Sequence, residues 1–413
     1  MTFAQSCVSG AVSALNAGGR ALRHFGADPP SLDIDQLRRA AYRRAGSTSF
    51  GAWDFSEPLE RLLKSYRDEA ELTTLGRITV RELLVSLLEN LLRMEQERAA
   101  NPAIERQEIV APVFIVGLPR TGTTHLHGMI SQDPASRAPF TWEVMYPAEP
   151  VTTQLEIDRT RARTDARLDW ANRLAPEFMR IHPIAADLPQ ECIAITAQTF
   201  MSIQFHTTHN VPSYQDWFED AVQDLGLDFH HRLLQHLQAK RPGNRWVLKA
   251  PGHLFALEGL LKRYPDAKVI HTHRDPLRVM ASMASHATVL RRAFSDRADP
   301  RQIATDWADR WARALDKFLA VRDHAPAEQF LDVNFETIEA DPLGAVQRVY
   351  DFLGWPVTAE ARTAINAFLT ANPKNKHGVH RYTLEQFGLS RATETARFRG
   401  YCERFGIAVR SER

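Results

Sequence analysis

The stretch FIVGLPRTGTTHLHGMI, residues 114–130, has the residue types and the spacing of an anion-binding loop. Gly117 and Gly122 allow backbone angles that turn successive N–H groups toward one point, and a helix after them adds the positive end of its dipole. The two glycines keep the spacing of the GxxxxGK[ST] loop that holds nucleotide triphosphates, but Thr123 replaces the lysine. The nearest cation is Arg120, whose planar guanidinium suits a tetrahedral oxyanion. The loop therefore predicts a local anion site that does not use the lysine of a triphosphate-binding loop.

The segments around this loop predict the elements of an α/β fold. A β-branched run at residues 113–116 leads into the loop, and a helical pattern follows it at residues 123–131. Further strands are predicted at residues 246–250, 267–273 and 330–335, and further helices at residues 253–264, 276–292 and 343–354. Such alternation is typical of a mainly parallel sheet with helical cover. We therefore predict a P-loop-like, doubly wound α/β fold.

Two regions without this alternation are predicted to be helical. Residues 1–105 form a charged, helical N-terminal region, and its clearest helix spans residues 78–100 with Thr79 as the N-cap. Residues 106–413 form the α/β domain. Within that domain, residues 144–245 are rich in helix signals, aromatic residues and histidines, and we predict a helical insertion that covers a substrate pocket.

Composition limits the partners and the location that we expect. The 413 residues are 44% apolar, and 51 basic residues nearly balance 50 acidic ones, so we expect neither nucleic acid binding nor stable membrane insertion. The N-terminus lacks a basic lead and no segment reaches membrane-spanning length, which predicts a cytoplasmic protein. Cys7, Cys192 and Cys402 lie far apart, so we expect reduced thiols. His206 and His209 lack further ligands at a suitable spacing, and no metal site is predicted.

A second motif, VIHTHRDPLRVMASMAS at residues 269–285, supplies another candidate anion site. Its predicted strand ends just before Arg274, and Ser282 follows eight positions later in the next helix. Ligands of open α/β sheets bind outside the carboxyl ends of the strands. We therefore expect Arg274 and the glycine loop to meet at that edge of the sheet.

Together the two motifs resemble those of sulfotransferases that use 3′-phosphoadenosine 5′-phosphosulfate (PAPS). PRTGTT resembles the 5′-phosphosulfate loop of that family, and Arg274 with Ser282 resembles the pair that holds the 3′-phosphate. DLPQEC, WVLKAPGH and NFETIEADPLGAVQRVYDFLGW extend the resemblance, which is to the bacterial branch of the superfamily, over residues 110–390. The resemblance implies a PAPS site without a metal, formed by Arg120, Thr121, Gly122, Thr123, Thr124, Arg274 and Ser282.

The resemblance also implies which residues take part in catalysis. Sulfuryl transfer needs in-line placement of the acceptor and stabilisation of the departing 5′-phosphate, and these roles suggest Arg120 and Lys249 as the stabilising cations. An acceptor hydroxyl also needs a general base. Glu143 is the first choice for that base, and the alternatives are Glu191, His125 and His127. The two histidines are two positions apart on a helix, so at most one of them can face the donor.

The sequence defines the acceptor and the competing functions less closely. Residues 200–218 mix aromatic side chains with histidines, which suits either a pocket for a hydroxylated lipid, sterol or phenol or ordinary buried packing. We expect a small-molecule acceptor that offers a hydroxyl or an amine. The alternatives are an atypical nucleotide kinase or triphosphatase, with Asp332 as a magnesium-binding acid, and a noncatalytic nucleotide-fold protein that docks through its helical N-terminal region. The sequence is compatible with a homo-oligomer without specifying one.

Overall fold

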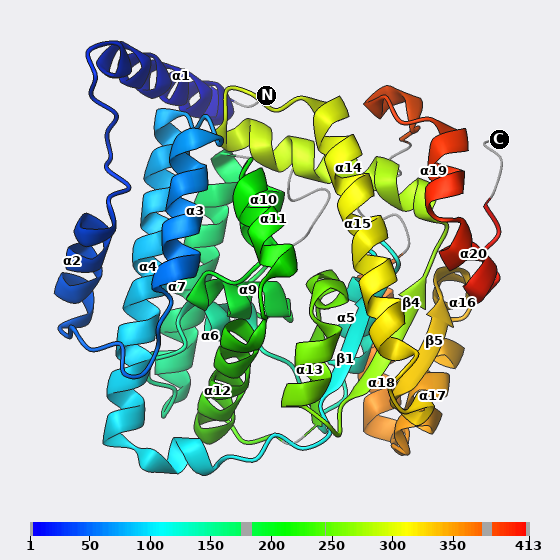
Figure 1. Ribbon diagram of the computed structural model, residues 1–413. Helices are drawn as coiled ribbons and strands as arrows, with labels where there is room; N and C mark the ends of the chain where they lie inside the picture. The colour runs from blue at the N-terminus through cyan, green and yellow to red at the C-terminus, as the bar shows by residue number, and fades with distance from the viewer. Residues whose placement is uncertain (1–2, 175–183, 244, 374–381, 410–413) are drawn as a thin grey trace.

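A parallel sheet forms the centre of the α/β part of the chain in the computed structural model, which describes residues 3–174, 184–243, 245–373 and 382–409 (Figure 1). Within these ranges five strands pair in the order β2-β3-β1-β4-β5, and every pair is parallel. The strands are β1 (Val113–Gly117), β2 (Ser136–Arg137), β3 (Arg245–Lys249), β4 (Lys268–His273) and β5 (Phe330–Asn334). Since all the strands run the same way, the segments that follow them meet at one edge of the sheet.

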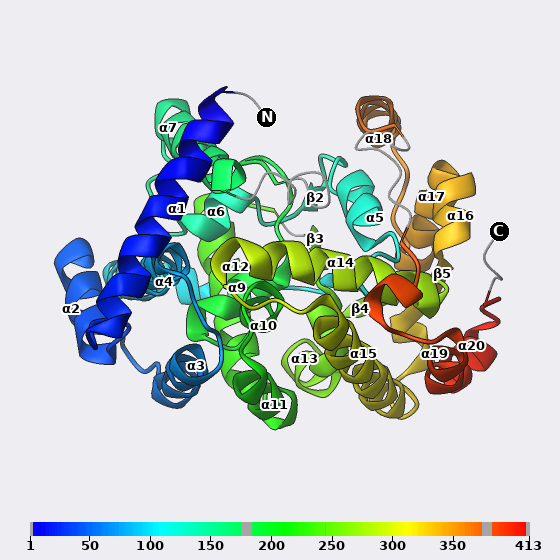
Figure 2. The same cartoon turned by 90° about the horizontal axis from the view of Figure 1, so that it is seen from above.

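Both faces of this sheet are buried, as expected for parallel strands. Alternate residues of β1 point to opposite faces: Val113 and Ile115 belong to one apolar cluster, and Phe114 and Val116 belong to another. Viewed from above, helices α5, α16 and α17 lie on one side of the sheet, and α13, α14 and α15 lie on the other (Figure 2). The bounds of the helices that follow the strands are α5 (Thr123–Ile130), η3 (Pro251–Phe255), α13 (Leu257–Arg263), α14 (Pro276–Phe294), α15 (Pro300–Arg322), η4 (Ala327–Gln329), α16 (Phe335–Ala340), α17 (Pro342–Leu353), α18 (Ala359–Ala371), η5 (Glu385–Phe387), α19 (Arg391–Arg397) and α20 (Arg399–Phe405).

Helices also make up the N-terminal region and the segment between β2 and β3. The N-terminal elements are α1 (Phe3–His24), α2 (Ile34–Ala45), α3 (Ser56–Asp68), α4 (Thr74–Ala100) and η1 (Pro102–Arg106). The segment between β2 and β3 contains α6 (Thr141–Met145), α7 (Gln154–Leu174), α9 (Cys192–Thr196), η2 (Ala197–Thr199), α10 (Gln204–Thr208), α11 (Pro212–Asp220) and α12 (Asp224–Lys240). In the described part of the chain, no helix combines the length and the apolar character that a membrane span requires.

The N-terminal helices share a core with the rest of the chain. Leu62 of α3 and Leu88 of α4 belong to the same buried cluster as Phe200 and Trp307. The N-terminal region stands on the opposite side of the molecule from α19 and α20 (Figure 1). Packing therefore does not separate residues 1–105 from the residues after them, and that domain boundary stays a sequence-based prediction.

The structure confirms the predicted α/β class and corrects several local predictions. Thr79 as the N-cap of the long helix was wrong, because α4 begins at Thr74 and the Thr73 hydroxyl accepts the N–H of Gly76 at 3.0 Å. The Thr79 hydroxyl instead donates to the Gly76 carbonyl at 2.9 Å. The helix predicted at residues 253–264 is divided into η3 and α13. Strand β2 has only two residues, too few for a periodic pattern to be recognised.

Gly117 occupies a position where a side chain would be obstructed. It ends β1 with φ at +145°, and it lies opposite Thr272 of β4 in the strand register. A Cβ atom on Gly117 would lie 2.5 Å from the Thr272 Oγ1 and 2.6 Å from the Thr272 carbonyl oxygen. The close pairing of β1 and β4 at the start of the loop therefore requires glycine.

We expect Gly117→Ala to lower the free energy of unfolding by about 1–3 kcal/mol, because the added methyl strains the backbone and pushes β4 away. Urea unfolding followed by circular dichroism would measure the change. Gly18→Ala is the matched control, since Gly18 is exposed in α1 and a Cβ there meets no atom within 4 Å. Equal stability of Gly117→Ala and the wild type would contradict this account of the β1–β4 contact.

Candidate active site

A cavity of about 280 Å³ lies at the edge of the sheet where the glycine loop and the β4 motif meet. Its walls come from segments that follow β1, β3, β4 and β5, and from α9, α10, α14 and α15. Polar groups on the wall include Arg120, Thr123, Thr124, His125, Glu191, Thr207, Arg274 and His286. Apolar groups include Ile193, Ile203, Met283, Trp311 and Phe335. A mostly apolar cavity with a few convergent charged groups is the usual form of a small-molecule site.

The glycine loop has the backbone conformation of an anion cradle. Gly122 has φ at +87° and forms the N-cap of α5, and Arg120 also has a positive φ, +66°. The buried Thr121 hydroxyl donates to the Leu118 carbonyl at 2.7 Å and lies 2.6 Å from the Thr272 hydroxyl. The Thr121 side chain therefore fastens the loop to β4, while Arg120, Gly122, Thr123 and Thr124 line the cavity.

Arg274 joins the second motif directly to the loop. Its Nη1 donates to the Arg120 carbonyl at 2.6 Å, across 154 residues of sequence. Burial lowers the pKa of Arg274, the Glu339 carboxylate opposes this effect, and the positive charges of Arg120 and Arg278 add to it. An arginine titrates so far above neutral pH that Arg274 stays charged. The cavity therefore has two guanidinium groups close together at one end.

Lys249 lies at the end of β3 beside the same loop. Its side chain is almost completely buried, and the Nζ atom donates to the Thr124 hydroxyl at 3.2 Å. The Nζ atom also forms an ion pair with the carboxylate of Glu191, which lines the cavity. Burial of an ion pair next to an anion cradle concentrates both signs of charge near the place where a ligand would bind.

Glu143 and Ser282 have surroundings that differ from those of the residues described so far. The Glu143 carboxylate, 3% exposed, accepts from Arg137 Nη1 and Nη2 at 2.9 and 2.7 Å, from Arg241 Nη1 at 3.1 Å and from the Phe140 N–H at 2.9 Å. Ser282 is half-buried on α14. Neither is among the described residues that line the cavity. Arg137 and Arg241 therefore occupy the carboxylate that was proposed as a base.

The two loop histidines have different surroundings, as their spacing predicts. His127 is buried, and its Nε2 donates to the Val247 carbonyl at 3.0 Å. Burial lowers the pKa of His127 to about 4, and the charge of Lys249 acts in the same direction. His125 lines the cavity, and burial lowers its pKa as well. Of the two, only His125 is in a position to meet a ligand there.

Among the residues that the structure describes, two clusters contain residue types that bind metals. Cys192 lies with His230 and His253, and His271 lies with His273 and Asp332, each set with its ligand atoms within 4.8 Å of one another. Burial raises the pKa of the Cys192 thiol to about 12, so the thiol is protonated at neutral pH. The Asp332 carboxylate accepts two hydrogen bonds from Arg322, at 2.7 and 2.8 Å. This arginine takes the position that a cation would need beside Asp332, the acid of the kinase alternative.

Comparison with known proteins decides the family. The model of the sulfotransferase family matches residues 112–359. The chain belongs to the sulfotransferase family. The crystal structure of sulfotransferase STF1 from Mycobacterium tuberculosis H37Rv has a TM-score of 0.80 and 33% identity, and the match covers 89% of this chain and 98% of that one. Sulfotransferase STF9 from Mycobacterium avium shares the fold, with a TM-score of 0.81, 24% identity, and coverage of 93% and 99%.

A curated relative adds a sulfotransferase with a named acceptor. The omega-hydroxy-beta-dihydromenaquinone-9 sulfotransferase Stf3 of Mycobacterium bovis is 25% identical over 292 residues, which are 67% of this chain and 71% of that protein. The matched family segment contains the glycine loop, Glu191, Lys249 and Arg274. The resemblance of these motifs to sulfotransferases is therefore confirmed at the level of the family.

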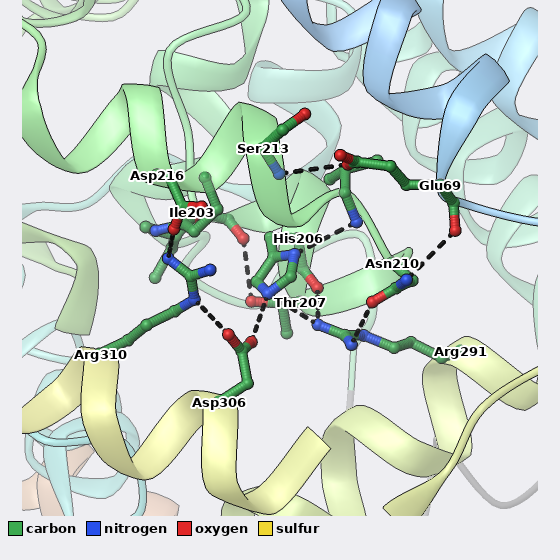
Figure 3. A network of polar contacts seen from close by, with 12 residues as sticks. Glu69, Ile203, His206, Thr207, Asn210, Ser213, Asp216, Arg291, Asp306 and Arg310 are labelled. Carbon is green, nitrogen blue, oxygen red and sulfur yellow. Dashed lines mark hydrogen bonds and ion pairs between the residues drawn. The ribbon is translucent and has the colours of Figure 1, made fainter. Parts of the chain in front are cut away.

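In this sulfotransferase a buried polar network supports the apolar wall of the cavity (Figure 3). Ile203 and Thr207 line the cavity, and His206 between them points to α15, where its Nε2 lies 2.7 Å from Asp306 Oδ2. The His206 Nδ1 accepts the Val211 N–H at 3.2 Å, so Nε2 carries the proton and donates it. Burial lowers the pKa of His206 to about 3, which keeps the ring neutral.

Arginines extend this network to α14 and along α15. Arg291 of α14 donates to the His206 carbonyl at 2.6 Å and to the Asn210 side chain at 3.1 Å. Arg310 Nε donates to Asp306 Oδ1 at 2.8 Å, and its Nη1 donates to Glu219 of α11 at 2.7 Å. The network therefore holds α10, α11, α14 and α15 together behind the residues that face the cavity.

We expect Asp306→Asn to lower the free energy of unfolding by about 1–3 kcal/mol, because it removes the anionic partner of the buried His206 and one of the anionic partners of the buried Arg310. Urea unfolding would measure this loss. Asp316→Asn, an exposed position on the same helix, should change stability by no more than about 0.5 kcal/mol. If both variants unfold like the wild type, the network does not stabilise this wall.

Proposed function

We propose that this chain transfers a sulfuryl group from PAPS to a hydroxyl or amine of a small, largely apolar acceptor. The observation that carries the proposal is the direct contact of Arg274 with the Arg120 carbonyl, because it joins two anion-binding motifs at one cavity. A donor with phosphate groups at its 3′ and 5′ positions needs two such sites. Family membership supports the transfer of a sulfuryl group over the kinase alternative.

The donor would bind along the loop and the start of α14. Arg120 and the N–H groups of Gly122, Thr123 and Thr124 would receive the 5′-phosphosulfate, with help from the positive end of α5. Arg274 would receive the 3′-phosphate, and Ser282 stays its proposed second contact. Lys249 would neutralise charge on the 5′-phosphate as the bond from sulfur to the bridging oxygen breaks. These cations would stabilise the negative charge of the departing 5′-phosphate, and the proposal assigns no step to a metal.

Glu191 replaces Glu143 as the general base that we propose. Glu191 lines the cavity and pairs with Lys249, whereas two arginines hold the Glu143 carboxylate. The acceptor oxygen would attack sulfur while a Glu191 oxygen takes the acceptor proton, and the electron pair of the broken bond would go to the 5′-phosphate. A donor phosphate near Lys249 would compete with Glu191 for the ammonium group and so make the carboxylate more available. His125 remains the alternative base.

The apolar wall supports an apolar acceptor. Ile193, Ile203, Met283 and Trp311 would contact its hydrocarbon part, while Thr207 and His286 offer polar groups. The name of the relative Stf3 refers to a hydroxylated menaquinone, and a hydroxylated lipid or phenol is the class that we propose here. A cytoplasmic location and a homo-oligomer stay predictions.

We expect Arg274→Ala to weaken binding of 3′,5′-bisphosphoadenosine by roughly 10- to 100-fold, because it removes a charge-assisted contact to the 3′-phosphate. Binding of AMP, which lacks that phosphate, should change much less. Isothermal titration calorimetry without added metal would measure both ligands, with Arg297→Ala as a control at an arginine whose side chain is 80% exposed. Equal loss for the two nucleotides would count against the 3′-phosphate assignment.

We expect Glu191→Gln to lower kcat by roughly 100- to 10,000-fold without weakening donor binding, because the amide cannot accept the proton and competes less with the donor for Lys249. Single-turnover transfer from PAPS to an apolar alcohol found by screening would measure it. Glu143→Gln is the contrasting variant: it should lower thermal stability through loss of the Arg137 pair and retain turnover. The reverse pattern, with turnover lost only in Glu143→Gln, would make Glu143 the base.

A further inference from the structure

Phe335 touches both anion-binding motifs, although neither motif contains it. It is the first residue of α16 and directly follows β5, so it lies at the same edge of the sheet as the loop and Arg274. It is half-buried and lines the cavity. Its position is therefore at the cavity and not in either apolar core.

The Phe335 ring lies against the guanidinium group of Arg274. The Arg274 Cζ is 3.8 Å from the centre of the ring, well within the range of cation–π attraction. A planar guanidinium that stacks on a ring keeps its N–H donors directed outward in its own plane. One of these donors, on Nη1, reaches the Arg120 carbonyl.

The same ring also packs against the loop. A Cβ atom on Gly122 would lie 3.0 Å from Phe335 Cδ2. The second glycine of the loop therefore has two reasons to be glycine, its φ of +87° and the closeness of this ring. Phe335 thus contacts Gly122 at one place and Arg274 at another.

An aromatic ring suits this position better than a carboxylate would. Arg274 lies near the positive charges of Arg120 and Arg278 and also near the carboxylates of Glu339 and Glu336, and Phe335 is the neighbour whose ring lies against the guanidinium itself. A carboxylate in contact with Arg274 would neutralise the guanidinium and compete with a phosphate for its donors. The face of a ring attracts the cation and leaves its charge and most of its donors available to an anion.

From this geometry we infer that Phe335 is a positioning residue for the 3′-phosphate of the donor, which it orients through Arg274 while it also packs against Gly122 of the loop. The inference rests on the proposed function, because it assigns the 3′-phosphate to Arg274. Phe335 acts through Arg274, so its removal should affect ligands with a 3′-phosphate more than those without one.

The test compares 3′,5′-bisphosphoadenosine and AMP by isothermal titration calorimetry with the full chain. Phe335→Leu removes the ring while keeping an apolar side chain, and it should weaken the bisphosphate roughly 3- to 30-fold, with a smaller change for AMP. Phe335→Tyr keeps the ring and should bind like the wild type. Phe352→Leu is the matched control. Phe352 lies on α17, outside the cavity lining, and makes a cation–π contact with Lys268 of β4.

A double-mutant cycle with Arg274→Ala makes the inference independent of any general loss of stability. If Phe335 acts through Arg274, adding Phe335→Leu to Arg274→Ala should cause little further loss of bisphosphate affinity. Thermal unfolding of each variant identifies a folding defect, and Phe335→Tyr then still reports on the ring. Unchanged bisphosphate affinity in Phe335→Leu, or an equal loss for both nucleotides, would overturn the inference alone. A wild type that does not prefer the bisphosphate to AMP would overturn the proposed function, and this inference with it.

Discussion

The pairing of β1 with β4 is the constraint on which the candidate site depends. The parallel register sets Gly117 opposite Thr272, and the Thr121 and Thr272 hydroxyls then meet at 2.6 Å. Because β1 ends in the glycine loop and β4 ends just before Arg274, this register alone brings the two anion-binding motifs together. Any side chain at Gly117 would force the strands apart at the point where the loop begins. The position of the cavity therefore depends on how the two strands pair, and the charged side chains act within the space that this pairing creates.

The two ends of the cavity are supported by different forces. At the loop end, Arg120 and Arg274 line the cavity, and Lys249 lies beside them against Thr124 and Glu191. Arg274 is held by an aromatic face and a carbonyl oxygen. Near the apolar residues, Asp306 pairs with His206 and Arg310 (Figure 3), and none of these three is among the described residues that line the cavity. Charge that is fully paired away from the cavity gives rigidity to the wall, whereas charge directed into the cavity is available to a ligand.

Local patterns in the sequence predicted the sheet and the loop, since strand periodicity and glycine spacing are properties of neighbouring residues. Contacts between distant residues were not predictable in this way. Arg241 is 98 residues from Glu143, whose carboxylate it holds, and Lys249 is 58 residues from its partner Glu191. Phe335 lies in the segment NFETIEADPLGAVQRVYDFLGW, which resembles sulfotransferases. Nothing in the residues around it indicates a cation–π contact with Arg274.

The absence of lysine at position 123 has a physical explanation in the order of the strands. In a triphosphate-binding loop the lysine follows the second glycine, inside the first turn of the helix. Here Thr123 holds that position and is nearly buried, while strand β3 lies beside β1 with Lys249 opposite Ile115. The ammonium group of Lys249 then reaches the Thr124 hydroxyl from the neighbouring strand. The cation beside the loop therefore comes from the sheet and not from the loop helix, and it forms an ion pair with Glu191. A cation and a carboxylate are thereby placed together beside the glycine loop, as the roles that we propose for Lys249 and Glu191 require.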